Sequence, residues 1–307
     1  MSLALLFPGQ GTQHPSMLAW IDACPEAQTT LAELAARLGG DWRARLQDPD
    51  WATSNAVAQS LLTGLGLAAW QCVADRVPAP SVVAGYSVGE LAAFSVAGVF
   101  DAQRALWLSH ERAASMQRAV AGIDTGLLAV TGGSDAAIAE VCLSHGLTVA
   151  IELSVDRRVL GGLASGLDRA ALELARRGSR CQRLAVRLAS HTPWMQAAVD
   201  EFAQRTAALP LATPTPTLVC NLTGGAVSRE PALRSALLEQ LARPVRWSRC
   251  MESIAERAPR CVLEVGAGHT LSDLWNQSFP NVPARSLDEF RSPGAAAAWV
   301  GGVLAGR

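Results

Sequence analysis

The pattern of apolar positions predicts a mixed α/β protein. Residues 3–7 form a continuous apolar run that ends at a Pro-Gly pair, which is typical of a strand covered on both faces. A second short apolar run, residues 81–84, is followed after one sharp turn by residues 90–97, which are rich in helix formers. Between residues 103 and 120 apolar positions recur at helical spacing. Strands that alternate with helices in this way favour a parallel sheet.

The turn between the second strand and its helix reads Gly85-Tyr86-Ser87-Val88-Gly89. A G-x-S-x-G pentapeptide at a strand-to-helix turn is typical of a nucleophile elbow, because the glycines let the backbone turn sharply and expose the serine hydroxyl. The N-terminus of the next helix then lies behind the hydroxyl, where its N–H groups favour an oxyanion. A plain Gly-Ser turn is the alternative, since such patterns also arise by chance. The flanking strand and helix favour Ser87 as a nucleophile.

The first strand leads into Gly9-Gln10-Gly11. We disfavour a phosphate-binding loop, because the third glycine of that motif is replaced by His14 and no Gly-Lys-Ser/Thr ending follows. Unpaired N–H groups between two glycines, at the carboxyl end of a strand, suit an oxyanion hole better.

Residues 126–187 have a different organisation, which predicts one compact β-α-β-β-α-β unit. Its expected elements are a strand at 127–130, a helix at 134–145, strands at 148–155 and 159–164, a helix at 167–177 and a strand at 181–186. We therefore expect an α/β-hydrolase-like parallel-sheet domain formed by residues 1–124 and 188–307, with a ferredoxin-like (βαββαβ) subdomain inserted at 125–187. The active site would lie in the cleft between these two lobes.

Composition narrows the functional classes. Of 307 residues, 50% are hydrophobic and 17% are charged, so a large buried core is expected and disorder is not. The formal net charge of −1 excludes a global attraction to nucleic acid. All 26 basic residues are arginines, which excludes Schiff-base chemistry through lysine.

The cysteines and the apolar termini indicate the cellular location. The seven cysteines include no C-x-x-C pair, so neither a zinc site nor a disulfide framework is predicted, and free thiols in a reducing compartment are expected. The apolar start is five residues long with no basic flank, and the apolar stretch 295–305 is too short and too glycine-rich to span a bilayer. We expect a cytoplasmic protein without a metal site or a membrane segment.

Six separated segments resemble, in the same order, landmarks of the malonyl-CoA:acyl-carrier-protein transacylases. They are FPGQGTQ (7–13), GYSVGELAA (85–93), RAASMQRAV (112–120), ASHTPWM (189–195), LARPVRW (241–247) and LEVGAGHTL (263–271). These matches span nearly the whole chain. The resemblance implies an acyltransferase that moves a malonyl group from malonyl-CoA to the phosphopantetheine-type thiol of an acyl carrier protein. It also implies a malonyl-serine intermediate and no cofactor.

The resemblance assigns roles to individual residues. It implies that Ser87 is the acylated nucleophile and that His191 is the base that takes its proton. The backbone N–H groups of Gln10 and Val88 would form the oxyanion hole. A main-chain carbonyl at Gln240 would orient the histidine ring.

The helix predicted at 103–120 carries the expected substrate-binding residues. The resemblance implies that Arg112 binds the free carboxylate of the malonyl group, with Met116 beside it. Leu108, Arg112 and Met116 are spaced four residues apart, so they share one face of this helix. An arginine on an apolar stripe is costly to bury unless a carboxylate meets it. That carboxylate is either the substrate's own or an acidic side chain of the core.

Three departures from the family pattern bear on the acceptor. Tyr86 occupies a position where the family usually has histidine, residues 151–157 replace an Asn-rich strand, and residues 266–269 read GAGH where the family has a GPGK-like turn. The segment GYSVGE is more similar to the epsilon subunit of malonate decarboxylase, the transacylase that charges that enzyme's own carrier subunit. The resemblance therefore implies this carrier as the acceptor.

Two other interpretations remain open. Among the five histidines, His191 and His269 are the serious candidates for a base. An α/β-hydrolase orders its triad Ser…Asp…His, and Ser87, Asp200 and His269 obey that order, which would make the protein an esterase or thioesterase. A non-enzymatic docking subunit is the third possibility, and the intact serine, histidine and arginine argue against it.

Overall fold

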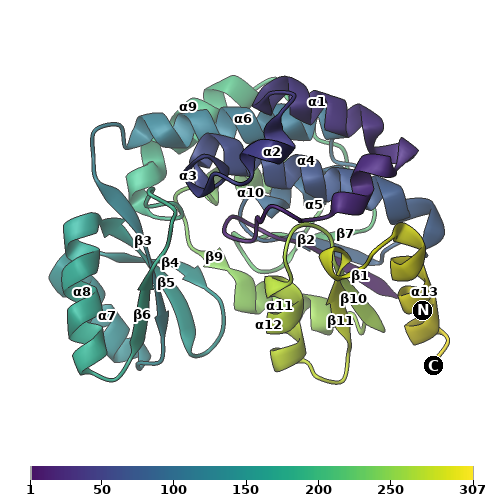
Figure 1. Cartoon of the computed structure of the whole chain (residues 1–307). Coiled ribbons are helices and arrows are strands. Elements are labelled where there is room, and N and C mark those ends of the chain that lie inside the picture. Colours follow the sequence, from purple (N-terminus) through teal and green to yellow (C-terminus); the bar gives the residue numbers. More distant parts are fainter. Residues whose placement is uncertain (1, 307) are drawn as a thin grey trace.

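The computed structural model describes residues 2–306, which form two lobes, each built on one sheet (Figure 1). The sheet of the large lobe has the strand order β11-β10-β1-β2-β7-β8. Its strands are β1 (Leu3–Phe7), β2 (Val82–Gly85), β7 (Thr217–Val219), β8 (Ala226–Val227), β10 (Cys261–Glu264) and β11 (Ala284–Ser286). All neighbouring pairs are parallel except β7 and β8. The expected α/β class with a parallel sheet is therefore confirmed.

Helices cover both faces of this sheet (Figure 1). The helices of the large lobe are α1 (Gln28–Leu38), α2 (Trp42–Arg45), α3 (Pro49–Thr53), α4 (Asn55–Val73), α5 (Gly89–Val96), α6 (Ala102–Ala119), α9 (Gln196–Thr206), α10 (Glu230–Glu239), α11 (Trp247–Ala255), α12 (Thr270–Ser278) and α13 (Pro293–Leu304). Short 3-10 helices lie at Ala19–Ala23, Pro25–Ala27, Ala74–Arg76, Pro193–Met195 and Leu287–Glu289.

Strand β1 separates two hydrophobic cores. Leu3, Leu5 and Phe7 face the core that contains α4 and α5, whereas Ala4 and Leu6 face the core that contains α11 and α12. Successive side chains of a strand point to opposite faces, so a strand buried on both faces must be apolar throughout. This explains the continuous apolar run at the start of the chain.

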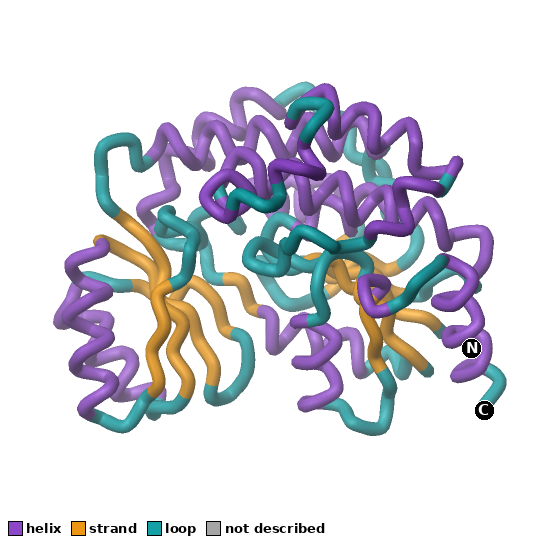
Figure 2. The backbone as a smooth tube through the Cα atoms, in the orientation of Figure 1, coloured by secondary structure: helices purple, strands orange, loops and turns teal. Residues whose placement is uncertain are grey.

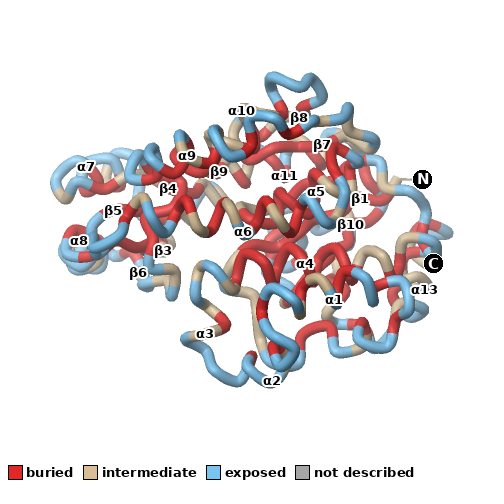
Figure 3. The backbone as a smooth tube through the Cα atoms, turned by 90° about the horizontal axis from the view of Figure 1, so that it is seen from above, coloured by how far each residue is buried: buried red, intermediate tan, exposed pale blue. Residues whose placement is uncertain are grey.

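Helix α4 is the central helix of the large lobe, and α1, α5 and α6 pack against it. The segment Asn55–Arg76 is long and apolar enough to cross a membrane by length and composition, yet 78% of its most apolar window is buried inside the protein. In Figure 3 the α4 backbone is largely buried between neighbouring elements. The apolar surface of α4 is therefore used by the core of the large lobe.

The small lobe follows the element order β-α-β-β-α-β. Its elements are β3 (Thr125–Thr131), α7 (Asp135–His145), β4 (Thr148–Glu152), β5 (Arg157–Leu163), α8 (Ala164–Arg176) and β6 (Arg180–Arg183). The strands lie in the order β6-β3-β5-β4, and β9 (Val245–Arg246) adds a parallel edge strand beside β4. Because β9 lies outside the expected insertion, a segment of the large lobe contributes a strand to the small sheet, in addition to the two chain crossings at the ends of the insertion. Figure 2 shows β9 on the path between the two groups of strands.

The two faces of the small sheet have different partners. Leu128 and Leu160 pack with α7 and α8 in a core of their own. Leu127 and Val159, on the other face, belong to the same core as Trp247 of the large lobe. The inserted lobe is therefore packed firmly against the large lobe.

The turn after β2 and the loop after β1 approach each other at van der Waals contact. A Cβ atom added at Gly89 would lie 2.2 Å from the carbonyl oxygen of Phe7, and one added at Gly85 would lie 2.1 Å from the carbonyl carbon of Gly89. A Cβ at Gly9 would lie 2.7 Å from the carbonyl oxygen of Tyr86. Only glycine fits at these positions, because the obstacles are backbone atoms that cannot move aside.

The close approach at Gly89 predicts that adding one methyl group there destabilises the protein. Gly89→Ala should lower the free energy of unfolding by about 3 kcal/mol, because β1 and the elbow would have to separate. Urea unfolding followed by circular dichroism measures the change. Gly301→Ala in α13 is the matched control: its Cβ would meet nothing within 4 Å, and it should stabilise the protein by about 0.5–1 kcal/mol. Equal effects of the two substitutions would contradict the prediction.

Candidate active site

Ser87 and His191 lie in hydrogen-bond contact although 103 residues separate them in the chain. The Ser87 Oγ is 2.7 Å from the His191 Nε2. Both residues have positive φ angles, 53° and 63°, in the left-handed region that non-glycine residues seldom occupy. Such conformations persist only where the surrounding structure enforces them, and they cluster at functional sites.

The His191 ring is fixed from its other side. Its Nδ1 lies 2.6 Å from the Gln240 carbonyl oxygen, and its backbone N–H donates to the Leu241 carbonyl oxygen at 2.8 Å. Because a carbonyl can only accept, Nδ1 carries the proton and Nε2 is free to accept the Ser87 hydroxyl. His191 is 1% exposed, and burial together with the Arg112 charge lowers its pKa to about 3. The ring is therefore neutral at physiological pH, with its Nε2 free to accept a proton.

The first loop and the elbow each carry one of the backbone N–H groups expected to form an oxyanion hole. Within residues 2–306, the N–H groups of Gln10 and Val88 donate to no protein acceptor. The Tyr86 N–H of the elbow donates to the Phe7 carbonyl oxygen at 2.8 Å, which joins the elbow to the end of β1 where the first loop begins. Both N–H groups therefore remain free for an acceptor from a ligand, which is the requirement for an oxyanion hole.

Arg112 is buried on α6 without a direct carboxylate partner among the described residues. It is 1% exposed, its Nη1 donates to Gln59 Oε1 at 2.7 Å and its Nη2 donates to Gln240 Oε1 at 3.3 Å. Its Nε has no partner within residues 2–306. Burial lowers the Arg112 pKa to about 10, a shift that the charge of Glu90 opposes, so the guanidinium stays charged at neutral pH. The structure therefore leaves donors of a buried cation available to an acidic ligand.

Met116 lies one turn beyond Arg112 and is also buried. Its sulfur accepts a hydrogen bond from Gln59 Nε2 at 3.3 Å. Leu108, Arg112 and Met116 are all buried, so the predicted stripe on this helix is the face that enters the core.

Two residues of the site had no role in the sequence analysis. Asn221 accepts the Ser87 N–H on its Oδ1 at 2.7 Å and donates from Nδ2 to the Gly85 carbonyl oxygen at 2.5 Å. Glu90 accepts the Asn221 N–H at 2.6 Å and the Gln240 Nε2 at 2.6 Å. Burial raises the Glu90 pKa, and the Asn221 bond, the Arg112 charge and the Gln240 bond oppose that rise. A lone acid inside the apolar helix after the elbow was the signal that could have identified Glu90.

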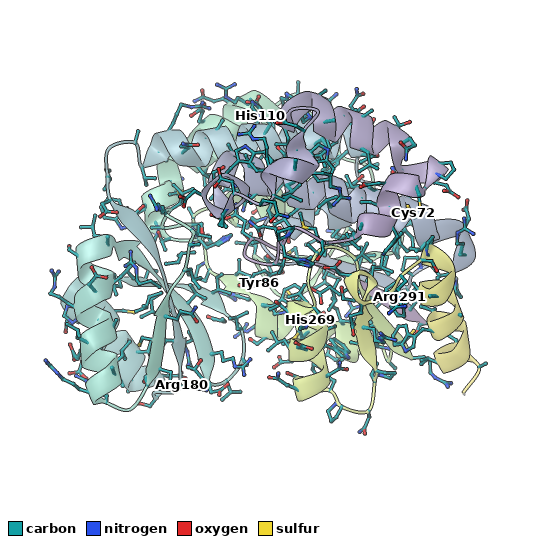
Figure 4. All side chains as sticks on the ribbon, viewed as in Figure 1. Cys72, Tyr86, His110, Arg180, His269 and Arg291 are labelled. Carbon is teal, nitrogen blue, oxygen red and sulfur yellow. The ribbon has the colours of Figure 1, made fainter. Side chains whose placement is uncertain are left out.

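Tyr86 lies against the first loop at Gly9 and against Trp247 at the start of α11. Its ring meets the Trp247 ring edge-on, with the centroids 5.4 Å apart. Figure 4 shows Tyr86 near the middle of the molecule.

The alternative hydrolase triad is not assembled, which corrects that interpretation. Asp200 lies on α9 and its carboxylate accepts from Gln196. The side chain of His269 is 63% exposed and pairs with Asp273 at 2.7 Å at the start of α12 (Figure 4). Ser87 meets His191 instead. Within residues 2–306, no group of three potential ligands is placed to hold a metal ion.

A cavity of about 900 Å³ lies between the two lobes. The large lobe lines it with Gln10, Asn55 and Leu188, and the small lobe with Thr125, Ala164 and residues 184–187. Asn55 accepts hydrogen bonds from Gln10 Nε2 at 3.2 Å and from Gln59 Nε2 at 2.7 Å. The cavity therefore borders the same hydrogen-bond network that reaches Arg112.

Solved structures of similar proteins share this fold. The malonyl-CoA:acyl carrier protein transacylase of Xanthomonas oryzae pv. oryzae superposes with a TM-score of 0.89 at 32% identity, covering 98% of this chain and 99% of that chain. A malonyl-transacylase solved in complex with a type II PKS acyl-carrier protein gives a TM-score of 0.89 at 28% identity, covering 98% and 99% of the two chains.

Sequence comparisons agree. The malonyl CoA-acyl carrier protein transacylase of Mycobacterium tuberculosis H37Rv is 34% identical over 296 residues, covering 93% of this chain and 96% of the relative. The protein of the same name from Escherichia coli K12 is 33% identical over 299 residues, with the same coverage. The sequence model of the family described as "Acyl transferase domain" matches residues 5–301. The chain therefore belongs to the acyl transferase domain family.

Proposed function

We propose that this protein transfers a malonyl group from malonyl-CoA to the phosphopantetheine-type thiol of an acyl carrier protein, through a malonyl ester on Ser87. The observation that carries the proposal is the 2.7 Å contact between Ser87 Oγ and a neutral, carbonyl-oriented His191. The names of the relatives support the malonyl donor and the carrier acceptor.

The first half-reaction forms the ester. His191 Nε2 accepts the Ser87 hydroxyl proton as Oγ attacks the thioester carbonyl carbon of malonyl-CoA. The developing oxyanion accepts hydrogen bonds from the N–H groups of Gln10 and Val88, and one such donor contributes about 3–4 kcal/mol in other enzymes. The C–S bond then breaks, and the CoA thiolate takes the proton from His191.

The second half-reaction reverses these proton transfers. The carrier thiol gives its proton to His191 Nε2 as its sulfur attacks the ester carbonyl. The C–O bond to Ser87 breaks, and the serine oxygen recovers the proton from His191. The malonyl group leaves as a thioester on the carrier, and the enzyme returns to its starting state.

In this mechanism Arg112 selects the substrate. Its unused N–H donors would bind the free carboxylate of malonyl in a charge-assisted pair, with Met116 packed beside it. Acetyl lacks this group. The absence of a direct acidic partner for Arg112 among the described side chains supports the substrate carboxylate as its missing partner.

We further propose that the acceptor is the carrier subunit of malonate decarboxylase and that the protein acts in the cytoplasm. The GYSVGE segment around Ser87 supports the first proposal, through its similarity to the epsilon subunit. All seven cysteines are free, which fits a reducing compartment.

Acylation of Ser87 is the first expected outcome. Incubation with malonyl-CoA should add the mass of one malonyl group, and peptide mapping by mass spectrometry should locate it on Ser87. Ser87→Ala should remain unlabelled. Labelling of a cysteine instead would refute the covalent mechanism.

The acylated protein also tests the acceptor. When the acylated protein is incubated with each carrier in turn, the malonate decarboxylase carrier should remove the malonyl label faster than the fatty-acid carrier does. The opposite order would assign the protein to fatty-acid synthesis, and rapid release of free malonate without any carrier would indicate a hydrolase.

His191 should behave as a base that does not titrate near neutrality. His191→Ala should lower kcat/KM by about 10²–10⁴-fold, whereas His269→Ala, the exposed control, should stay within about threefold. Because the His191 pKa is lowered to about 3, the wild-type kcat/KM should hold steady as the pH falls from 7 to 5. An ordinary histidine base would lose activity below about pH 6.5. If kcat/KM falls with a midpoint at about pH 6.5, the prediction is wrong and the His191 ring is solvated during turnover.

Arg112 should control the choice between acyl groups. Arg112→Ala should lower kcat/KM for malonyl transfer by about 10²-fold or more, because two charge-assisted hydrogen bonds are lost. Acetyl transfer should stay equal or improve, so the malonyl-to-acetyl ratio is the measurement. Arg112→Lys should recover only part of the ratio, since an ammonium lacks the planar fork. A proportional loss of both activities would make Arg112 structural.

A further inference from the structure

Two buried charges in the site are bridged by a single amide. The Gln240 side chain accepts from Arg112 Nη2 at 3.3 Å through Oε1 and donates to Glu90 Oε2 at 2.6 Å through Nε2. Arg112, Gln240 and Glu90 are each at most 1% exposed. Arg112 and Glu90 themselves form no direct ion pair.

The donors and acceptors fix the orientation of this amide. A guanidinium can only donate, so the Gln240 oxygen must face Arg112 and its NH2 group must face residue 90. The other oxygen of Glu90 faces the Asn221 N–H at 2.6 Å, which is also an obligatory donor. Both Glu90 oxygens therefore accept N–H donors. These two bonds and the Arg112 charge favour the ionised carboxylate against the burial that raises the Glu90 pKa, and an amide at position 90 could not accept both donors.

Gln240 connects this bridge to the reacting groups. Its main-chain oxygen holds His191 Nδ1 at 2.6 Å, and its Nε2 also lies 3.4 Å from the Ser87 carbonyl oxygen. Glu90 is also connected to the elbow through Asn221. Glu90 accepts the Asn221 N–H, and the Asn221 side chain accepts the Ser87 N–H. A disturbance at Glu90 therefore reaches both the base and the nucleophile.

We propose that Glu90 is a positioning residue that orients Gln240 and serves as the counter-charge of Arg112 before the substrate arrives. A direct ion pair would occupy the guanidinium donors that the acyl carboxylate needs. Placing the carboxylate one amide away compensates the buried charge and leaves those donors open. The selectivity part of this inference rests on the proposed malonyl transfer.

Glu90→Gln is the first test. In either orientation of the new amide, its NH2 group faces another donor, which is the Asn221 N–H or the Gln240 NH2 group. Rotating the Gln240 amide would remove the second conflict but would turn its NH2 group toward Arg112, which is also a donor. We expect the melting temperature to fall by about 5–10 °C and kcat for malonyl transfer to fall by about 10²-fold.

The exchanged pair Glu90→Gln/Gln240→Glu keeps the proposal falsifiable if the single variant folds poorly. In this variant the new Glu at 240 accepts from Arg112 and from the new amide at 90, whose oxygen accepts the Asn221 N–H. Every bond of the bridge regains a donor and an acceptor, so the double variant should melt at a higher temperature than either single variant. The carboxylate now lies on Arg112, however, so the malonyl-to-acetyl ratio in kcat/KM should fall by about 10²-fold relative to wild type.

Glu264→Gln is the matched control. Glu264 is also a fully buried carboxylate that accepts two N–H groups, those of Leu271 and Ser272 in the first turn of α12, but it lies at the end of β10, outside the bridge. It should lower the melting temperature without changing the malonyl-to-acetyl ratio.

Two results would overturn the proposal. One is a Glu90→Gln protein that keeps malonyl transfer within threefold of wild type. The other is a double variant that melts no higher than the single variants, or that regains malonyl and acetyl transfer equally. If the wild-type protein transfers no malonyl, the proposed function fails instead, and the melting temperatures of the single and double variants still decide whether Glu90 orients Gln240.

Discussion

A guanidinium buried without a carboxylate beside it is the constraint on which the site depends. An isolated buried cation is strongly unfavourable, so the surrounding structure must supply oxygen acceptors and a compensating charge. Gln59 and Gln240 supply the oxygens, and Glu90 supplies the charge from the far side of Gln240. Because the Gln240 main chain also holds His191, the arrangement that accommodates Arg112 is the same one that orients the His191 ring.

The Ser87–His191 pair adds a second constraint, which is backbone strain. Ser87 and His191 both occupy the left-handed region, and each is held there by bonds from remote segments. Asn221 fixes the Ser87 N–H, and the Leu241 carbonyl fixes that of His191. The small lobe contributes as well, because a Cβ atom added at Gly161 of β5 would lie 2.7 Å from Thr192, the residue after His191. The insertion therefore supports the histidine segment as well as bordering the cleft.

Much of the fold could be predicted because it is encoded locally. The apolar run of β1, the glycines of the elbow and the periodicity of α6 each depend on neighbours in the sequence, so the α/β class and the location of Ser87 were predictable. The choice between His191 and His269 was harder, since both histidines follow plausible motifs. The hydrogen bond to Ser87 Oγ distinguishes His191 from His269 because it depends on which segment the fold brings to the elbow.

The sequence by itself determined the chemistry that is available: a serine in a strand-to-helix turn, five histidines, arginine in place of lysine throughout and an apolar pattern for a parallel sheet. Only the tertiary structure decided which polar groups meet. Glu90, Asn221 and Gln240 are 19 to 150 residues apart along the chain, and nothing local requires their contact. Burial imposes it, because each donor and acceptor removed from water must find a partner, and the partners are those that the packed lobes place within reach.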